Sequence, residues 1–255
     1  VGVFYMQRIK CTISYDGTLF SGYQVQVNTR TVQGEIEKVL QTMHKKAVKV
    51  IASGRTDAGV HATGQVIHFD TSLAIPAEKW VQALNAMLPD DIAILSAEYV
   101  HETFHARYDA QGKQYRYVID LSKVRNPLTR NYTYHYPYPV DVERIKKACT
   151  YAIGTHDFSS FCAANTSVVD KVRTIYSISC EQVGTSLTLT YTGNGFLYNM
   201  VRILTGTLIE IGAGMKEPED MKKIIEACDR SAAGKTAPAQ GLYLQEVYYM
   251  VIPTA

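Results

Sequence analysis

The feature that most constrains the fold of this chain is a series of short strands and amphipathic helices that occurs twice in the same order. Residues 8–15 alternate, with Ile9, Cys11 and Ile13 on one side, and this pattern predicts a strand. Thr31 is a typical N-cap residue, and the apolar residues after it recur at helical spacing. The elements predicted for the first half of the chain are strand 8–15, a helix after Thr31, strands 48–53 and 65–71, a helix from Pro76 to about Leu88, and strand 92–100. This β-α-β-β-α-β order is typical of ferredoxin-like folds.

The second half repeats this order with additions. Its elements are predicted as strand 113–121, helix 141–153, strands 171–183 and 186–192 around Gly184, helices 198–211 and 218–228, and strand 244–252. We therefore expect an α+β protein with two ferredoxin-like or RRM-like halves, whose antiparallel sheets lie side by side and form a central cleft. The expected domains are residues 6–105 and residues 106–255.

Composition indicates a soluble globular protein. The 255 residues include 46% hydrophobic and 20% charged residues, and no apolar run is long enough to span a bilayer. The first ten residues have no basic region followed by an apolar core, so no secretory signal is expected. The sequence thus predicts a cytoplasmic protein with no membrane segment.

The cysteines and histidines do not follow the spacing of a metal site. The five cysteines are odd in number, widely separated and form no C-x-x-C pair, so we expect reduced thiols. The histidines His61, His68, His105 and His156 match no known set of ligands, and structural hydrogen bonding is the favoured interpretation.

Positive charge is concentrated in one segment. Residues 107–147 hold nine basic and four acidic residues, and seven tyrosines lie among them. Clustered cations bind phosphates, and aromatic faces stack on unpaired bases, so the segment is a candidate surface for nucleic acid. A solvated basic face with half-buried tyrosines would give the same pattern.

Residues 53–61, Ser-Gly-Arg-Thr-Asp-Ala-Gly-Val-His, are the most unusual segment. They form a predicted loop between two strands, and glycines in it allow a tight backbone. Arg55 lies two residues from Asp57, and a nearby guanidinium favours an ionised carboxylate, as a nucleophile or base requires. The alternative is a plain turn in which Asp57 bonds to nearby backbone amides.

This loop resembles the signature of the bacterial tRNA pseudouridine synthase A family, and further similar motifs follow in the family's order over nearly the whole chain. They are Ser14–Thr18 with Phe20, Gly22 and Gln24; Thr31–Gly34 with Glu37; Lys113–Tyr117; Gly154–Phe158 with Phe161; Gly195–Arg202; and Ala237–Pro238 with Gly241–Leu244. The resemblance implies a pseudouridine synthase fold. Tyr198 and Asn199 depart from it, since histidines are common there in the family.

By this resemblance the chain is an isomerase that converts uridine to pseudouridine at tRNA positions 38, 39 and 40, in the anticodon stem-loop. Asp57 matches the catalytic aspartate, which would attack either uracil C6 or ribose C1′ of a nucleotide flipped out of its stack. The reaction needs no cofactor, and no metal is expected. The resemblance also implies a homodimer whose partner is tRNA.

Three further site residues follow from the same resemblance. Tyr115 matches the tyrosine that stacks on the uracil. Arg202 matches the arginine that pairs with the aspartate, and Arg55 the arginine that fills the space left by the flipped nucleotide.

Each assignment has a simpler alternative. By spacing alone Tyr115 is a half-buried core aromatic of an alternating strand, and Arg116 then points to the opposite face, toward phosphate or solvent. Arg202 is the stronger oddity, because it lies in an otherwise apolar helix and buried arginines are nearly always paired. Asp157, next to His156, is a candidate to support the site or to cap a helix.

Two other classes of function remain open at this point. The first is a non-catalytic RNA-binding protein with two RRM-like sheets, although no RNP-type run is present. The second is a phosphotransferase with an aspartate nucleophile, suggested by Asp16-Gly17-Thr18, although no second aspartate or acidic metal ligand accompanies it.

Overall fold

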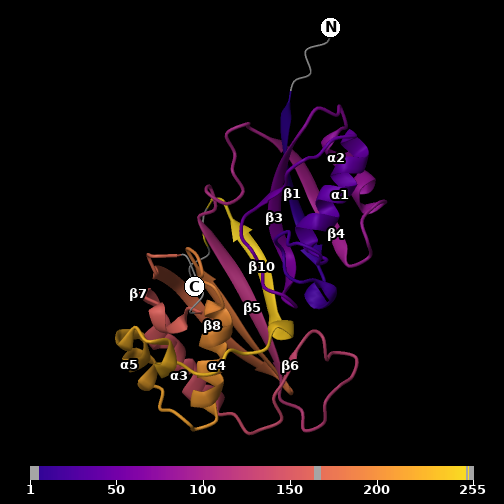
Figure 1. Ribbon diagram of the computed structural model, residues 1–255. Helices are drawn as coiled ribbons and strands as arrows, with labels where there is room; N and C mark the ends of the chain where they lie inside the picture. Colours follow the sequence, from indigo (N-terminus) through magenta and orange to yellow (C-terminus); the bar gives the residue numbers. More distant parts are fainter. Residues whose placement is uncertain (1–5, 164–167, 251, 253–255) are drawn as a thin grey trace. The chain divides into compact units, whose positions relative to one another are not determined.

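The computed structural model describes residues 6–163, 168–250 and 252. These residues form two compact units, and the colours of Figure 1 follow the chain through both. The first unit contains the described residues up to Gln111 together with Leu244–Met250, and the second contains Gly112–Tyr243 and residue 252. The predicted domains 6–105 and 106–255 stay a prediction, because compact units are defined by contacts and not by independent folding. No helix in these ranges is long and apolar enough to cross a membrane.

The first unit is built on a sheet with the strand order β4-β1-β3-β10. β1 (Gln7–Tyr15) pairs antiparallel with both β3 (His61–Thr71) and β4 (Ile92–Val100), and β10 spans Leu242–Tyr248. In β1 every second residue from Ile9 to Tyr15 is buried, as the alternation predicts. The predictions for β1 and β4 are confirmed.

The predicted strand 48–53 is wrong over most of its length, because only β2 (Ile51–Ala52) pairs with β3. Val50 is buried, but its backbone bonds to side chains of a helix and not to a strand. Its N–H donates to the Glu37 carboxylate at 3.0 Å, and its carbonyl accepts from the Gln33 amide at 3.3 Å. Alternation of apolar residues records burial and does not specify the hydrogen-bond partner.

Two helices lie together on one side of this sheet in Figure 1. α1 (Val32–His44) begins at Thr31, whose hydroxyl accepts from the N–H of Gly34 at 3.2 Å, and this confirms the predicted cap. α2 (Ala77–Asn85) follows Pro76 and ends three residues before the predicted Leu88. At this end the Asn85 amide exchanges hydrogen bonds with the backbone of Ile94 in β4, which attaches the helix to the sheet.

β3 is buried along nearly all of its length, and residues 101–109 contact both β3 and the neighbouring β1. The N–H of Ala106 donates to Nδ1 of His68 at 3.1 Å, and the Arg8 guanidinium donates to the carbonyl of Phe104 at 2.8 Å. His68 also lies edge-on to the ring of His105, with ring centroids 5.1 Å apart. His68 is thus a structural acceptor.

The second unit contains the antiparallel strand order β5-β9-β8-β7, with a short β6 that runs parallel to β5. The bounds are Gly112–Asp120 for β5, Tyr134–His135 for β6, Gly154–Asp157 for β7, Val172–Val183 for β8 and Ser186–Gly193 for β9. The β8–β9 hairpin turns at Gly184 (φ +58°), as predicted. β6 and β7 were not predicted. Asp157 ends β7 and accepts from the N–H and hydroxyl of Ser159, the first residue of the 3-10 turn Ser159–Phe161.

Three helices complete the second unit, namely α3 (Val142–Ala152), α4 (Met200–Gly212) and α5 (Asp220–Ala227). Eleven of the thirteen residues of α4 are buried, so α4 forms the centre of this unit's core. α4 begins two residues after the predicted start, because Asn199 adopts φ +61°. The predicted strand 244–252 instead runs from Leu242 to Tyr248. The α+β class with antiparallel sheets is confirmed.

We predict that protonation of His68 makes the first unit sensitive to acid. Burial lowers the pKa of His68 to about 4, and the positive charges of Arg8 and His105 act in the same direction, against the carboxylates of Asp70 and Asp109. An unfolded histidine binds a proton below a pH of roughly 6.5, so the unfolded state binds more protons between these values. The free energy of unfolding should therefore fall as the pH drops from about 6.5 toward 4.

Urea unfolding at pH values of about 7 and 5 tests this, in a range above most carboxyl pKa values. The variant His68→Gln, whose amide oxygen accepts from Ala106 without titrating, should show a smaller loss of stability between the two pH values than the wild type. The exposed His101→Gln serves as the control and should show the wild-type loss. An equal loss in all three proteins would contradict the prediction.

Candidate active site

The loop 53–61 joins β2 to β3 in the first unit, and it presents Asp57 at its turn. Asp57 is half-buried and Arg55 is exposed. The N–H of Val60 donates to the backbone carbonyl of Asp57 at 3.1 Å, and Gly59 between them has φ +77°. The turn is therefore closed by the backbone, in a conformation that favours glycine. That closure uses the Asp57 carbonyl and not its carboxylate.

Buried polar groups fix the first part of the loop to the sheet. The amide of Gln65, which is buried in β3, accepts from the Ser53 hydroxyl at 2.7 Å and donates to the carbonyl of Gly54 at 2.9 Å. The Tyr15 hydroxyl bonds to the Thr56 hydroxyl at 2.7 Å. Burial raises the pKa of Tyr15 to about 12, so this phenol stays protonated and can donate. The backbone before Asp57 is thereby held at Gly54 and at Thr56, on either side of Arg55.

A second segment, residues 16–23, packs against the same loop. The N–H of Tyr23 donates to the carbonyl of Thr56 at 3.0 Å. A Cβ at Gly17 would lie 2.0 Å from the carbonyl oxygen of Val60, so only glycine permits this approach. The motif that contains Gly17 and Gly22 and the motif that contains Asp57 are therefore one packed structure.

His61 and Asp16 have structural partners in this packing. Nδ1 of the buried His61 accepts from the N–H of Gly17 at 3.0 Å and lies 3.2 Å from the Asp16 carboxylate. The same carboxylate accepts from the N–H and hydroxyl of Thr18 and caps the 3-10 turn Gly17–Leu19. Asp16 is thus the cap of a turn, which argues against its use as a phosphotransferase nucleophile.

Tyr115 lies in the second unit, on the buried face of β5. It pairs with Tyr191 of β9 and is 8% exposed, and the ring of Phe196 meets it edge-on with centroids 5.1 Å apart. Residues of β5 alternate between buried and half-buried, so Arg116 points to the opposite face, as predicted. There the guanidinium lies 4.9 Å from the ring centroid of Tyr243, a cation–π contact, which qualifies the expectation of phosphate or solvent at Arg116.

Arg202 lies in the first turn of α4, where its backbone and its side chain bind the same neighbouring segment. Its Nε donates to the carbonyl of Ala237 at 2.8 Å, and its own carbonyl accepts from the N–H of Ala237 at 3.0 Å. Nη1 donates to the side-chain oxygen of Asn199 at 2.9 Å. These bonds fix the direction of the guanidinium from its backbone side.

The structure therefore gathers the predicted residues in two groups. Arg55 and Asp57 share one loop of the first unit. In the second unit, Tyr115 contacts Phe196, the hydroxyl of Tyr117 donates to Pro238 at 2.7 Å, and the charge of Arg202 lowers the otherwise raised pKa of Tyr117. The approach of Asp57 to Tyr115 and Arg202 stays a prediction.

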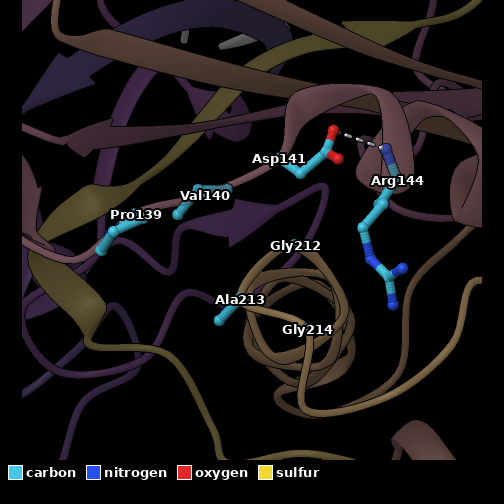
Figure 2. A pocket seen from close by; sticks show the side chains of 7 residues that line it. All are labelled: Pro139, Val140, Asp141, Arg144, Gly212, Ala213 and Gly214. Atoms are coloured by element: carbon cyan, nitrogen blue, oxygen red, sulfur yellow. Dashed lines mark hydrogen bonds between the residues drawn. The ribbon is translucent and has the colours of Figure 1, made fainter.

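A hollow of the second unit lies elsewhere. Figure 2 shows this space of about 420 Å³ beside the end of α4 and the start of α3, lined by Pro139, Val140, Asp141, Arg144, Gly212, Ala213 and Gly214. The Arg144 guanidinium donates to the carbonyls of Ile211 and Lys216, which joins the two helices. None of the predicted site residues lines this hollow. Within residues 6–163, 168–250 and 252, no group of histidine, cysteine and acidic side chains is arranged to hold a metal ion.

The residues that brace the loop were not singled out in the sequence. Gln65 and Tyr15 are the main ones, together with Thr56 inside the signature. A polar residue within an apolar strand was the available signal for Gln65, since a buried amide requires partners. Asn199 was noted only as a departure from the family, yet it both caps α4 and binds Arg202.

Known proteins are similar to this chain over nearly its whole length. A family model described as tRNA pseudouridine synthase matches residues 12–109 and 148–250. The tRNA pseudouridine synthase A of Bacillus pumilus is 56% identical over 244 residues, which is 95% of this chain and 99% of that protein. The protein of the same name from Bacillus subtilis is 55% identical with the same coverage. A solved Cbf5-Nop10-Gar1 complex matches with 10% identity and a TM-score of 0.34, over 79% of this chain and 54% of that one.

The sequence matches define a class of RNA-modifying isomerases. The chain belongs to the tRNA pseudouridine synthase family. Asp57, Arg55 and Arg202 fall within the two stretches that the family model matches, whereas Tyr115 lies between them.

We predict that Gln65→Leu loosens the loop that carries Asp57. The substitution removes the hydrogen bonds of the Gln65 amide to the Ser53 hydroxyl and to the Gly54 carbonyl, and an intramolecular hydrogen bond contributes about 0.5–1.5 kcal/mol to stability. Urea unfolding should show a lower stability, and amide hydrogen exchange at residues 54–57 should become faster. Gln82→Leu on the exposed side of α2 is the matched control. Equal exchange in the two variants would refute the bracing role.

Proposed function

We propose that this protein isomerises uridine to pseudouridine at positions 38, 39 and 40 in the anticodon stem-loop of tRNA, with Asp57 as the nucleophile. The observation that carries the proposal is the loop 53–61, which is held before Asp57 at Gly54 and Thr56 and closed after it by the Val60 N–H, while the side chain of Asp57 stays partly accessible. A preorganised carboxylate of this kind suits attack on a bound nucleotide. The positions in tRNA rest on the family resemblance.

The reaction rearranges bonds within one nucleotide and needs no external group. Asp57 attacks either C6 of the uracil or C1′ of the ribose, and the N1–C1′ glycosidic bond breaks. The uracil rotates, its C5 forms a bond to C1′, and the C5 proton leaves while N1 gains a proton. Release of Asp57 restores the carboxylate, so substrate and product are isomers and no oxidant, reductant or cofactor enters the balance.

The other three residues have positioning roles in this proposal. Tyr115 is held by Tyr191 and Phe196, so its ring has a fixed orientation for stacking on the uracil. Arg202 pairs with the Asp57 carboxylate and favours its ionised form. The exposed Arg55 enters the space that the flipped nucleotide leaves, which offsets part of the few kcal/mol that flipping costs.

The two alternative functions lose support. Asp16 of the Asp-Gly-Thr motif caps a turn, and the match to an isomerase family covers both halves of the chain. A non-catalytic RNA-binding protein would not require the closed turn and the bracing around Asp57.

Replacement of Asp57 tests the proposal directly. Asp57→Asn should lower turnover by at least about a thousandfold, as removal of a nucleophile does, while tRNA binding is retained. Turnover is measured as release of tritium from C5-labelled uridine in tRNA, without added metal or nucleotide. The matched control is Asp90→Asn, an equal change at an exposed aspartate, which should keep wild-type turnover. Substantial tritium release by Asp57→Asn would refute its role as nucleophile.

We also propose a homodimer located in the cytoplasm, and both proposals rest on the family resemblance. Light scattering coupled to gel filtration should give twice the chain mass of 28.4 kDa at the concentration used for activity assays. A monomer mass at that concentration would contradict the dimer.

A further inference from the structure

The loop of residues 121–133, called the basic loop below, joins β5 to β6 in the second unit (Figure 1). It carries the cations Lys123, Arg125 and Arg130, and all three are exposed. No aspartate or glutamate occurs between residues 121 and 140. The basic loop therefore presents three positive charges with no acidic residue in its own stretch of chain.

The structure divides the basic segment 107–147 into two kinds of cation. Those on α3 are engaged, since Arg144 pairs with Glu217 at 3.1 Å, Lys146 with Glu143 at 2.8 Å, and Lys147 with Glu219. Arg144 also binds two backbone carbonyls. The charge of these residues is thus largely balanced where it lies.

The cations of the basic loop are different. Within the described parts of the chain, none of the three lies within 4 Å of a carboxylate oxygen, and Arg130 donates only to the carbonyl of Pro127 at 2.8 Å. Their positive charge is therefore available to a partner. The sequence alone does not distinguish these cations from the paired ones among the nine basic residues of the segment 107–147.

Hydrogen bonds at both ends hold the basic loop in place. The N–H of Leu121 donates to the carbonyl of Thr185 at 2.8 Å, and His135 bonds to the carbonyl of Ser122 at 2.8 Å. The Tyr243 hydroxyl donates to the carbonyl of Tyr132 at 2.6 Å. A loop fixed at these points loses less conformational freedom when it binds.

We infer that the basic loop binds the phosphate backbone of the tRNA substrate. Fixed cations with no carboxylate partner complement phosphates, and release of the counterions condensed on RNA supplies the free energy. Such contacts position a nucleic acid without reading its sequence. This inference rests on the proposed function, because it takes tRNA as the substrate.

Two double variants that remove the same charge test the inference. Lys123→Gln with Arg125→Gln removes two cations of the basic loop, and Lys146→Gln with Lys147→Gln removes two paired cations of α3. The dissociation constant for tRNA is measured by filter binding between about 50 and 200 mM salt. The loop variant should bind more weakly, and its slope of log affinity against log salt should be smaller by about 1.5, at roughly 0.7–0.9 for each phosphate that the protein no longer neutralises. The α3 variant should keep the wild-type slope.

Equal slopes for the two variants would overturn the inference, because the effect would then follow net charge alone. Three further results would also overturn it: unchanged tRNA binding by the loop variant, loss of self-association in that variant with tRNA affinity kept, or wild-type binding to anionic lipid vesicles that only the loop variant loses. Tritium release by the wild-type protein distinguishes a failure of the proposed function from a failure of the inference about the basic loop. Its absence would refute the proposed function, whereas its presence with equal slopes would refute only the role of the basic loop.

Discussion

The arrangement around Asp57 depends on one buried amide. Gln65 sits in β3, where it cannot bond to water, so both ends of its side chain must find partners in the protein. Ser53 and Gly54 supply them, and this ties the start of the loop that carries Asp57 to the middle of the sheet. Tyr15 from β1 fixes Thr56 from the other side. Because both strands are central to the sheet of the first unit, the position of Asp57 is set by that unit's core and not by the loop itself.

In the second unit, apolar packing and backbone hydrogen bonds hold the candidate site residues in position. Tyr115 and Tyr117 lie on the buried face of β5, where Tyr191 and Phe196 limit the movement of Tyr115. Arg202 is fixed by two hydrogen bonds with the backbone of Ala237 rather than by packing alone: its Nε donates to the Ala237 carbonyl, and its own carbonyl accepts from the Ala237 N–H. The left-handed backbone of Asn199 starts α4 at the point where the Asn199 side chain can receive the guanidinium. A residue that departs from the common family pattern thereby supports the arginine that follows it.

The number of basic residues in a segment does not show which of them are paired with carboxylates. The sequence identified residues 107–147 as a basic segment, and the structure shows that the α3 portion is balanced by Glu143, Glu217 and Glu219. Two of these glutamates are about 70 residues away in the chain, so no local pattern could have indicated the pairs. The cations of the basic loop have no such carboxylate partner among the described residues. Basic residues are therefore paired with carboxylates in α3, whereas those of the basic loop are not paired with carboxylates of the described residues.

The sequence by itself determined the α+β class, the strands at 8–15 and 92–100, the cap at Thr31 and the family, because alternation, helical spacing and a specific motif are local properties of the chain. It also indicated Asp57, Arg55, Tyr115 and Arg202 as candidates, through resemblance and not through any spacing rule. Only the tertiary structure decided that Val50 bonds to α1 rather than to a strand, that Gln65 and Tyr15 brace the loop, and that Arg116 lies over Tyr243. The physical reason is that a buried polar group must be satisfied by whatever the fold brings near it, and that partner can lie anywhere in the chain.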